Sequence, residues 1–313
     1  MKINLVGFWD HNNYTQLTLL EYRRFISADF NFEFYDAHKT YDKKTLFVCN
    51  AYQYNQNSML IDNLIANGYK IVFETLQEMQ TSSYHTQHNV LHLVCGKSTT
   101  PAPNTVEVPL YFWYHEHGLS NYQDIERSST IDKKFLLMMN LSKNFRDDIY
   151  NKFTDILDQG LYSYVGQNIL LDGDNFSADW WDRYINPSWY NRTEFSVVVE
   201  SQMNTGGIFI TEKTMKPLAL KHPFILLGSL GTLEFMQSVG FVTYDNLFDE
   251  TYDKSSNRLN LVHKQVKDYS MRGYDKLTTE KIEHNYNLFF NNARLEQSFR
   301  ESIINPLLEF VNE

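Results

Sequence analysis

The sequence predicts a mixed α/β protein built on mostly parallel sheets. Short apolar runs rich in Val, Ile and Phe alternate with stretches of helical spacing along the chain. The segment Glu194–Gly228 has the order strand, loop, helix, strand, which is the order of one βαβ unit. The chain has 313 residues, and this length is enough for two modest α/β domains.

Composition narrows the class further. Hydrophobic residues make up 42% of the chain and charged residues 21%, which is typical of a globular protein rather than a disordered one. The net charge of −10 argues weakly against nucleic-acid binding, because duplex binders usually present a basic face. Cys49 and Cys95 each lie in an apolar, strand-like run, so we expect buried free thiols and a reducing, cytoplasmic environment. No run approaches the roughly 20 apolar residues of a membrane span.

The first part of the chain is predicted to hold five strands and two helices. Met59–Asn67 has helical spacing, and Gly68 is a natural residue to end that helix. Lys97–Pro109 is rich in proline and is expected to be a loop. The other expected elements are a helix at Thr15–Ser27 and strands at Ile3–Phe8, Asn31–Tyr35, Thr45–Cys49, Lys70–Phe73 and Val90–Cys95.

The second part repeats the alternation. A polar stretch at residues 121–133 is the best linker candidate, which predicts an N-terminal domain at 1–120 and a C-terminal domain at 134–313. Asp172–Ser188 is polar and is expected to be a surface excursion. The expected strands are Phe135–Met139, Leu161–Val165, Phe195–Val199, Pro223–Gly228 and a short one at Phe241–Val242, and the expected helices are Arg146–Asp158, Leu259–Tyr269 and Thr278–Phe310.

The loop-to-helix corner in Glu194–Gly228 indicates an anion site. Thr211 is a good helix N-cap, and Glu212 and Lys213 follow in the first turn. Free N–H groups and the dipole at a helix N-terminus attract anions, and Lys213 adds a full positive charge there. Helix N-termini of βαβ units lie at the carboxyl ends of the strands, where open α/β sheets bind ligands. We therefore expect this corner to hold a diphosphate.

A second strand-to-helix corner lies at Asn140–Tyr150. Arg146 stands where a helix is expected to open after the strand Phe135–Met139. A guanidinium at such a corner can grip phosphate oxygens with two parallel hydrogen bonds. The alternative, without a binding role, is a surface arginine paired with Asp147 or Asp148.

These two corners resemble the donor-site segments of the α1,3-fucosyltransferases. That family has a strand ending in Phe-Glu-Asn, a short loop, then (Tyr/Phe)-(Ile/Val)-Thr-Glu-Lys, a helix and a strand after Pro. Glu200, Thr211, Glu212 and Lys213 match this pattern, whereas Ser201 stands where the family has Asn. The resemblance implies the GT-B architecture, in which two Rossmann-like domains face each other across a cleft.

The resemblance also implies roles for these residues. Glu212 would meet the nucleotide ribose, Lys213 would meet the diphosphate, and Glu200 would point toward the donor sugar. Asn140 and Arg146 match a second family segment, in which the arginine contacts the donor diphosphate. Golgi members of the family carry a membrane anchor that is missing here, which favours a soluble form from a bacterium or from a virus-infected host.

Glu74 is the candidate general base. An inverting sugar transfer needs a carboxylate that takes the proton of the acceptor hydroxyl. The family places this glutamate just after an apolar strand, within Gly-Glu-Asn, and Glu74 follows the run Lys70–Phe73 without that Gly or Asn. Glu78 is a rival for the same role, and a helix-start glutamate that only complements the dipole is the structural alternative.

A metal site has little support in the sequence. His115 and His117 flank Glu116, but no further ligand lies at a tight spacing. Asp172–Asp174 forms an Asp-x-Asp string, which is weak evidence for a metal-bound diphosphate. We therefore expect no metal and no cofactor, with a nucleotide-diphosphate sugar as co-substrate.

The function expected from the sequence is an inverting glycosyltransferase that moves a sugar from a nucleotide-diphosphate donor to a glycan or other hydroxyl acceptor. The resemblance implies GDP-fucose as the donor. One alternative is a viral glycosyltransferase acting on hydroxymethylated bases in DNA, which is not favoured because no Lys/Arg cluster is evident. Another is an inactive sugar-binding or virion protein that retains the fold, suggested by Ser201 and by the missing Gly and Asn around Glu74.

Overall fold

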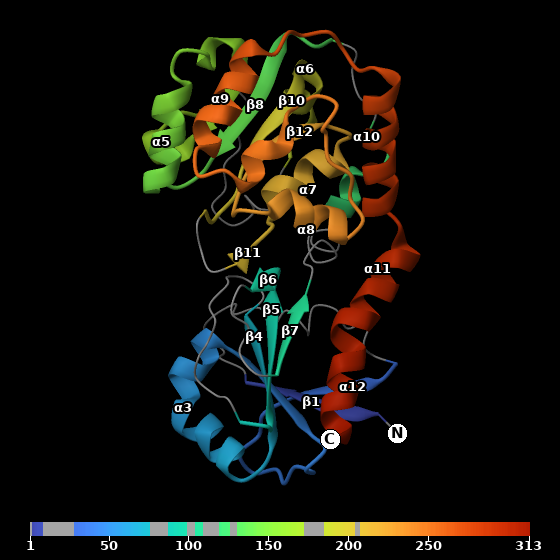
Figure 1. Cartoon of the computed structure of the whole chain (residues 1–313). Coiled ribbons are helices and arrows are strands. Elements are labelled where there is room, and N and C mark those ends of the chain that lie inside the picture. Colours follow the sequence, from blue (N-terminus) through green and yellow to red (C-terminus); the bar gives the residue numbers. More distant parts are fainter. Residues whose placement is uncertain are drawn as a thin grey trace. The chain divides into compact units, whose positions relative to one another are not determined.

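The computed structural model describes residues 2–8, 28–75, 87–98, 104–108, 119–125, 130–171, 185–203 and 207–313. The chain divides into two compact units, one made of residues 1–109 with 292–313 and the other of residues 110–291. Figure 1 shows a sheet with covering helices in each unit. Among the described residues, no helix combines the length and the apolar character that crossing a membrane requires.

A six-stranded parallel sheet forms the first unit, in the order β2-β1-β3-β4-β5-β7. Helix α3 (Ala51–Ala66) packs on β3 and β4, and Gly68 follows it with φ +76°. Gly68 thus ends the helix as predicted, since glycine adopts this left-handed conformation at little cost. The strands are β1 (Ile3–Gly7), β2 (Phe30–Phe34), β3 (Leu46–Asn50), β4 (Lys70–Thr75), β5 (Val90–Cys95), β6 (Lys97–Ser98) and β7 (Thr105–Val108).

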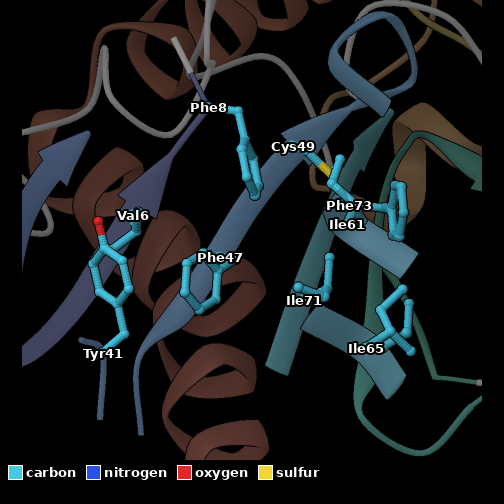
Figure 2. Packing of buried hydrophobic residues seen from close by; sticks show 10 residues of the cluster. Val6, Phe8, Tyr41, Phe47, Cys49, Ile61, Ile65, Ile71 and Phe73 are labelled. Atoms are coloured by element: carbon cyan, nitrogen blue, oxygen red, sulfur yellow. The ribbon is translucent and has the colours of Figure 1, made fainter. Parts of the chain in front are cut away.

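An aromatic and aliphatic cluster fills the core of this unit (Figure 2). Phe47 lies at its centre, with ring centroids 5.2 Å from Tyr41 and 6.1 Å from Phe8. Cys49 is fully buried as a free thiol, as predicted, and burial raises its pKa well above the usual value. Apolar side chains from the strands, from α3 and from the segment before β3 therefore hold this unit together.

The end of the chain belongs to this first unit. Helix α11 (Asn292–Phe299), the π-helical turn η5 (Arg300–Ile304) and α12 (Asn305–Asn312) follow one another. Arg300 pairs with Asp29 at 2.9 Å, and Lys70 Nζ donates to the carbonyl of Val311 at 3.2 Å. The first unit therefore includes residues 292–313, which were predicted to belong to the C-terminal domain 134–313. The single expected helix Thr278–Phe310 is also interrupted after Phe289.

The second unit holds a four-stranded parallel sheet in the order β12-β10-β8-β9. Its strands are β8 (Lys133–Met139), β9 (Gly160–Tyr164), β10 (Thr193–Val199) and β12 (Phe224–Leu227), with a two-residue strand β11 (Gly207–Ile208). Its α-helices are α5 (Asn144–Phe153), α6 (Pro187–Arg192), α7 (Glu212–Ala219), α8 (Thr232–Ser238), α9 (Arg258–Asp268) and α10 (Lys276–Phe289). Its 3-10 turns are η1 (Leu119–Tyr122), η2 (Leu157–Gln159), η3 (Val165–Gln167) and η4 (Glu250–Lys254).

Several expectations are corrected by these elements. The predicted loop Lys97–Pro109 contains β7, an edge strand whose residues alternate in burial only in part. Phe241 and Val242 are not a strand, because the side chain of Asn285 occupies the backbone groups of Val242 with two bonds of 2.8 Å. The parallel α/β class itself is confirmed in both units.

Candidate functional site: the carboxyl ends of β8 and β10

The second unit has a topological switch point between β8 and β10. The connection from β8 through α5 leads to β9 on one side, whereas the connection from β10 through α7 leads to β12 on the other. Neighbouring strands whose connections diverge in this way leave a crevice at their carboxyl ends, and ligands of open α/β sheets bind there. The two corners singled out in the sequence are the loops that follow β8 and β10.

Glu200 follows β10 and is fully buried. Its carboxylate accepts from the backbone N–H of Thr211 at 2.9 Å, from the Thr211 hydroxyl at 2.6 Å and from the Thr214 hydroxyl at 2.5 Å. A fourth bond comes from the N–H of Ser201 at 3.1 Å. The carboxylate therefore fastens the start of α7 to the end of β10. The proposed contact with a donor sugar has to coexist with these four bonds.

Lys213 lies in the first turn of α7, where Thr211 is the N-cap as predicted. Its Nζ donates to Ser201 Oγ at 3.0 Å and to Thr211 Oγ1 at 3.3 Å, and it forms an ion pair with Glu212. The side chain of Lys213 keeps 14% exposure, so its ammonium group lies at the margin of the buried network. An anion that approaches this corner meets a cation already held in place.

Glu212 is buried beside two lysines. Burial alone would raise the pKa of its carboxyl group, but the charges of Lys213 and Lys216 and the bond from Lys213 outweigh it and hold the pKa below its usual value. The carboxylate is therefore ionised near neutral pH. A buried carboxylate of this kind is a strong acceptor for hydroxyl groups.

Arg146 lies in the first turns of α5 and is only 3% exposed. Its Nη1 donates to the carbonyl of Leu141 at 2.8 Å, and its Nε has no hydrogen-bond partner among the described residues. Burial lowers the pKa of the guanidinium, while nearby groups that include Glu212 and Glu200 act in the opposite direction. Arg146 is thus within electrostatic range of Glu200 and Glu212, so the two predicted corners lie near each other. The alternative of a surface arginine paired with Asp147 or Asp148 is wrong.

Sequence reasoning missed Lys143. This residue stands at the N-cap position of α5, and no side chain caps that helix end. Its Nζ donates to the carbonyl oxygen of Ser201 at 2.9 Å. A cation three residues before the predicted helix start at Arg146 was the available signal, but its partner on the other loop could not be predicted.

The loop after β8 is also fixed from the side of β9. Gly166 donates its N–H to the carbonyl of Asn140 at 3.0 Å. A Cβ added to Gly166 would lie 2.5 Å from the backbone N of Ser142, so the two loops approach as closely as glycine permits. Tyr164 donates its hydroxyl to Asp147 at 2.6 Å, which joins β9 to α5.

Buried polar atoms without a partner gather at this edge of the sheet. Such an atom costs about 1–3 kcal/mol, so native proteins contain few of them and a cluster points to a missing ligand. Within the described part of the chain, the atoms of this kind in the loops after β8, β10 and β12 and in the first turns of α5 are Asn140 Oδ1, Arg146 Nε, Gln202 Oε1 and Ser229 Oγ.

The candidate base Glu74 lies in the first unit. It is 2% exposed and sits within β4, opposite Asn50 of β3 and Leu93 of β5, because the strand continues to Thr75. The expectation that Glu74 follows the strand is therefore corrected, and with it the alternative of a helix-start glutamate. Its rival Glu78 lies outside the described residues.

The structure does not describe the residues that the sequence offered as metal ligands. His115, Glu116, His117 and the string Asp172–Asp174 lie outside the described residues. In the part of the chain that the structure describes, no three His, Cys, Asp or Glu side chains come together as metal ligands.

Comparison with known proteins gives structural likeness only. No family model matches the chain, and no curated protein matches its sequence. An α1,3-fucosyltransferase crystal structure is similar with a TM-score of 0.50 and 12% identity, covering 93% of this chain and 90% of that one. A structure of such an enzyme with GDP-fucose gives 0.48 and 14%, covering 100% and 82%, and one of a DNA-modifying β-glucosyltransferase gives 0.45 and 10%, covering 97% and 99%. The first likeness shows that the chain has the Rossmann-like GT-B fold.

Proposed function

We propose that this protein is a glycosyltransferase that binds a nucleotide-diphosphate sugar at the carboxyl ends of β8 and β10. The observation that carries the proposal is the meeting of two loops at Ser201, which accepts a hydrogen bond from Lys143 and another from Lys213. Cationic side chains and buried polar atoms that lack partners stand together at the switch point of a parallel sheet. Such a site suits a polar, doubly charged ligand.

In this proposal Lys213 binds the diphosphate and stabilises its charge as it leaves the sugar. The N–H groups at the start of α7 add to that stabilisation. Glu212, ionised and buried, accepts from the ribose hydroxyls. Because fixed cations supply the positive charge, the transfer is proposed to need no metal ion and no cofactor.

The donor proposed first is GDP-fucose. The support is the likeness of Thr211, Glu212 and Lys213 to the Thr-Glu-Lys segment of the α1,3-fucosyltransferases. Ser201 replaces the Asn of that family, and its hydroxyl and carbonyl groups are the acceptors for the two lysines. A different nucleotide sugar would use the same diphosphate contacts.

The acceptor step is proposed to be inverting. The acceptor oxygen attacks the anomeric carbon while its proton passes to the carboxylate of Glu74. The bond between that carbon and the phosphate oxygen breaks, and the diphosphate leaves with the electron pair. Glu74 is proposed for this role because a carboxylate is a group that can take such a proton, and it is a buried carboxylate of the first unit.

A nucleotide-sugar panel tests the proposal. Melting temperature is measured with GDP, UDP, GDP-fucose and UDP-glucose, since a ligand that binds only the folded state raises it. Release of the nucleoside diphosphate is then measured with glycan acceptors and, separately, with hydroxymethylated DNA, in the presence of a chelator. The proposal predicts a stabilising nucleotide and turnover that Lys213→Ala abolishes and that Lys264→Ala, an exposed change in α9, leaves unchanged.

The alternatives are separated by the same assay. Transfer to DNA would identify the acceptor as nucleic acid, and binding without turnover would favour an inactive sugar-binding protein. A protein that none of the four ligands stabilises would contradict the proposed function.

A further inference from the structure

We propose that Lys143 is a second cationic contact to the diphosphate of the donor, working from the loop after β8 opposite Lys213. The inference rests on the proposed function and adds a residue to its binding site that the sequence did not single out. It adds Lys143 to Lys213 and to Arg146, for which the family resemblance implies a contact with the diphosphate.

The geometry at Ser201 is the first support. Lys143 Nζ lies 2.9 Å from the carbonyl oxygen of Ser201, and Lys213 Nζ lies 3.0 Å from its hydroxyl oxygen. Ser201 therefore accepts hydrogen bonds from two ammonium groups, one at the start of α5 and one in the first turn of α7. Like charges placed this close repel each other, and an anion with two charged centres relieves that repulsion.

The neighbourhood of Lys143 is the second support. Arg146, three residues further on, is 3% exposed and leaves Nε without a partner among the described residues. Nearly full burial of a guanidinium with an unused donor indicates a ligand that supplies an acceptor. Lys143 itself is exposed and stands at the uncapped start of the ten-residue helix α5. The cation, the uncapped helix end and the unused donor thus lie at the same strand-to-helix corner.

Exposure also makes Lys143 suitable for a clean test. Its hydrogen bond to Ser201 goes to a backbone oxygen, so replacing Lys143 leaves no side-chain partner on Ser201 that must be changed with it. Lys152 offers a matched control, because it is an exposed lysine in the last turn of the same helix. The Arg replacement Lys143→Arg keeps the charge and serves as the conservative variant.

The experiment is isothermal titration of GDP, GMP and guanosine, and of UDP, UMP and uridine, into the full chain with a chelator present. The proteins are wild type, Lys143→Ala, Lys143→Arg, Lys152→Ala and Lys213→Ala, each checked for an unchanged melting temperature. A charge-assisted bond to a phosphate predicts that Lys143→Ala weakens binding of the preferred diphosphate about ten- to a hundredfold. Lys143→Arg should restore most of this loss, and Lys152→Ala should bind like wild type.

The nucleoside series shows whether Lys143 contacts a phosphate or only joins the loops after β8 and β10 through its bond to Ser201. If Lys143 binds the diphosphate, Lys143→Ala weakens the diphosphate more than the monophosphate and leaves the nucleoside unchanged. Equal weakening of all three ligands, or wild-type affinity in Lys143→Ala while Lys213→Ala loses the diphosphate, overturns the inference and leaves the proposed function standing. Absence of binding by wild type to GDP and UDP overturns both.

Discussion

Thr211 gives both its backbone N–H and its hydroxyl to the carboxylate of Glu200, at 2.9 and 2.6 Å. This pairing fixes the start of α7 against the end of β10, and a third bond from Thr214 completes it. Glu200 is thus first an anchor for the helix that carries Lys213. Any chemical role for Glu200 would act through this arrangement or in addition to it.

Glu200→Gln tests the anchor. An amide in place of the carboxylate turns one acceptor into a donor that faces Thr211 or Thr214, so we expect a loss of about 1–3 kcal/mol in the free energy of unfolding. Urea denaturation measures it. The control Glu280→Gln removes an exposed carboxylate of α10 and should change stability by less than about 0.5 kcal/mol. Unchanged stability together with lost turnover would instead assign Glu200 to the chemistry alone.

Gly166→Ala tests the contact between the loops after β8 and β9. Its new Cβ would lie 2.5 Å from the backbone N of Ser142, so the loop that carries Lys143 must move. We expect about 1–3 kcal/mol of destabilisation and weaker binding of the nucleoside diphosphate. Gly160→Ala is the comparison, because its Cβ would meet the buried ring of Phe135 at the opposite end of β9. It should destabilise the fold, but its nucleotide affinity should stay that of wild type, and equal losses of affinity would argue against a local effect of Gly166.

Asp155 predicts a pH dependence. Hydrogen bonds from Lys267 and His263, both in α9, lower the pKa of its carboxyl group from 3.8 to about 2. Because the folded-state pKa is depressed, the stabilisation is present above the ordinary pKa and is lost as the pH falls from about 4 through about 2. The melting temperatures of wild type and Asp155→Asn should therefore differ at pH 6 and converge toward pH 2. Asp148→Asn, an exposed change in α5, should parallel wild type, and a constant difference between wild type and Asp155→Asn would contradict the prediction.

Glu212→Gln tests the proposed ribose contact. Loss of the ionised carboxylate should weaken binding of the preferred nucleoside diphosphate about tenfold, because charged hydrogen bonds to hydroxyl groups are lost. The same change should have little effect on the 2′,3′-dideoxy analogue, which has no ribose hydroxyls to donate. Titration of both ligands into both proteins gives the coupling between Glu212 and the ribose. An equal loss for the two ligands would place Glu212 elsewhere.

Local signals were enough to predict the two corners of the site. The apolar runs that became β8 and β10 end within one residue of the expected positions, and Thr211 is the N-cap that its residue type indicated. Strand ends and helix starts depend on neighbouring residues in the chain, so the sequence contains them. The proposed roles of Arg146 and Lys213 stay predictions, although both residues lie at this edge of the sheet.

Contacts between distant segments could not be predicted in the same way. The bond from Lys143 to Ser201 joins two loops, and no local pattern in either loop predicts a contact with the other. Asn285 satisfies the backbone of Val242 from another element, which is why an apolar pair expected as a strand is irregular. One local signal was overlooked: Asn186 accepts from Ser188 as the N-cap of α6, with Pro187 in its first turn.

The most direct measurement is a crystal structure with the nucleoside diphosphate that most raises the melting temperature. The account predicts phosphate oxygens within about 3 Å of Lys213 Nζ, at the carboxyl ends of β8 and β10. Density for the diphosphate at any other place on the protein, with the ammonium of Lys213 still bonded to Ser201, Thr211 and Glu212, would contradict it.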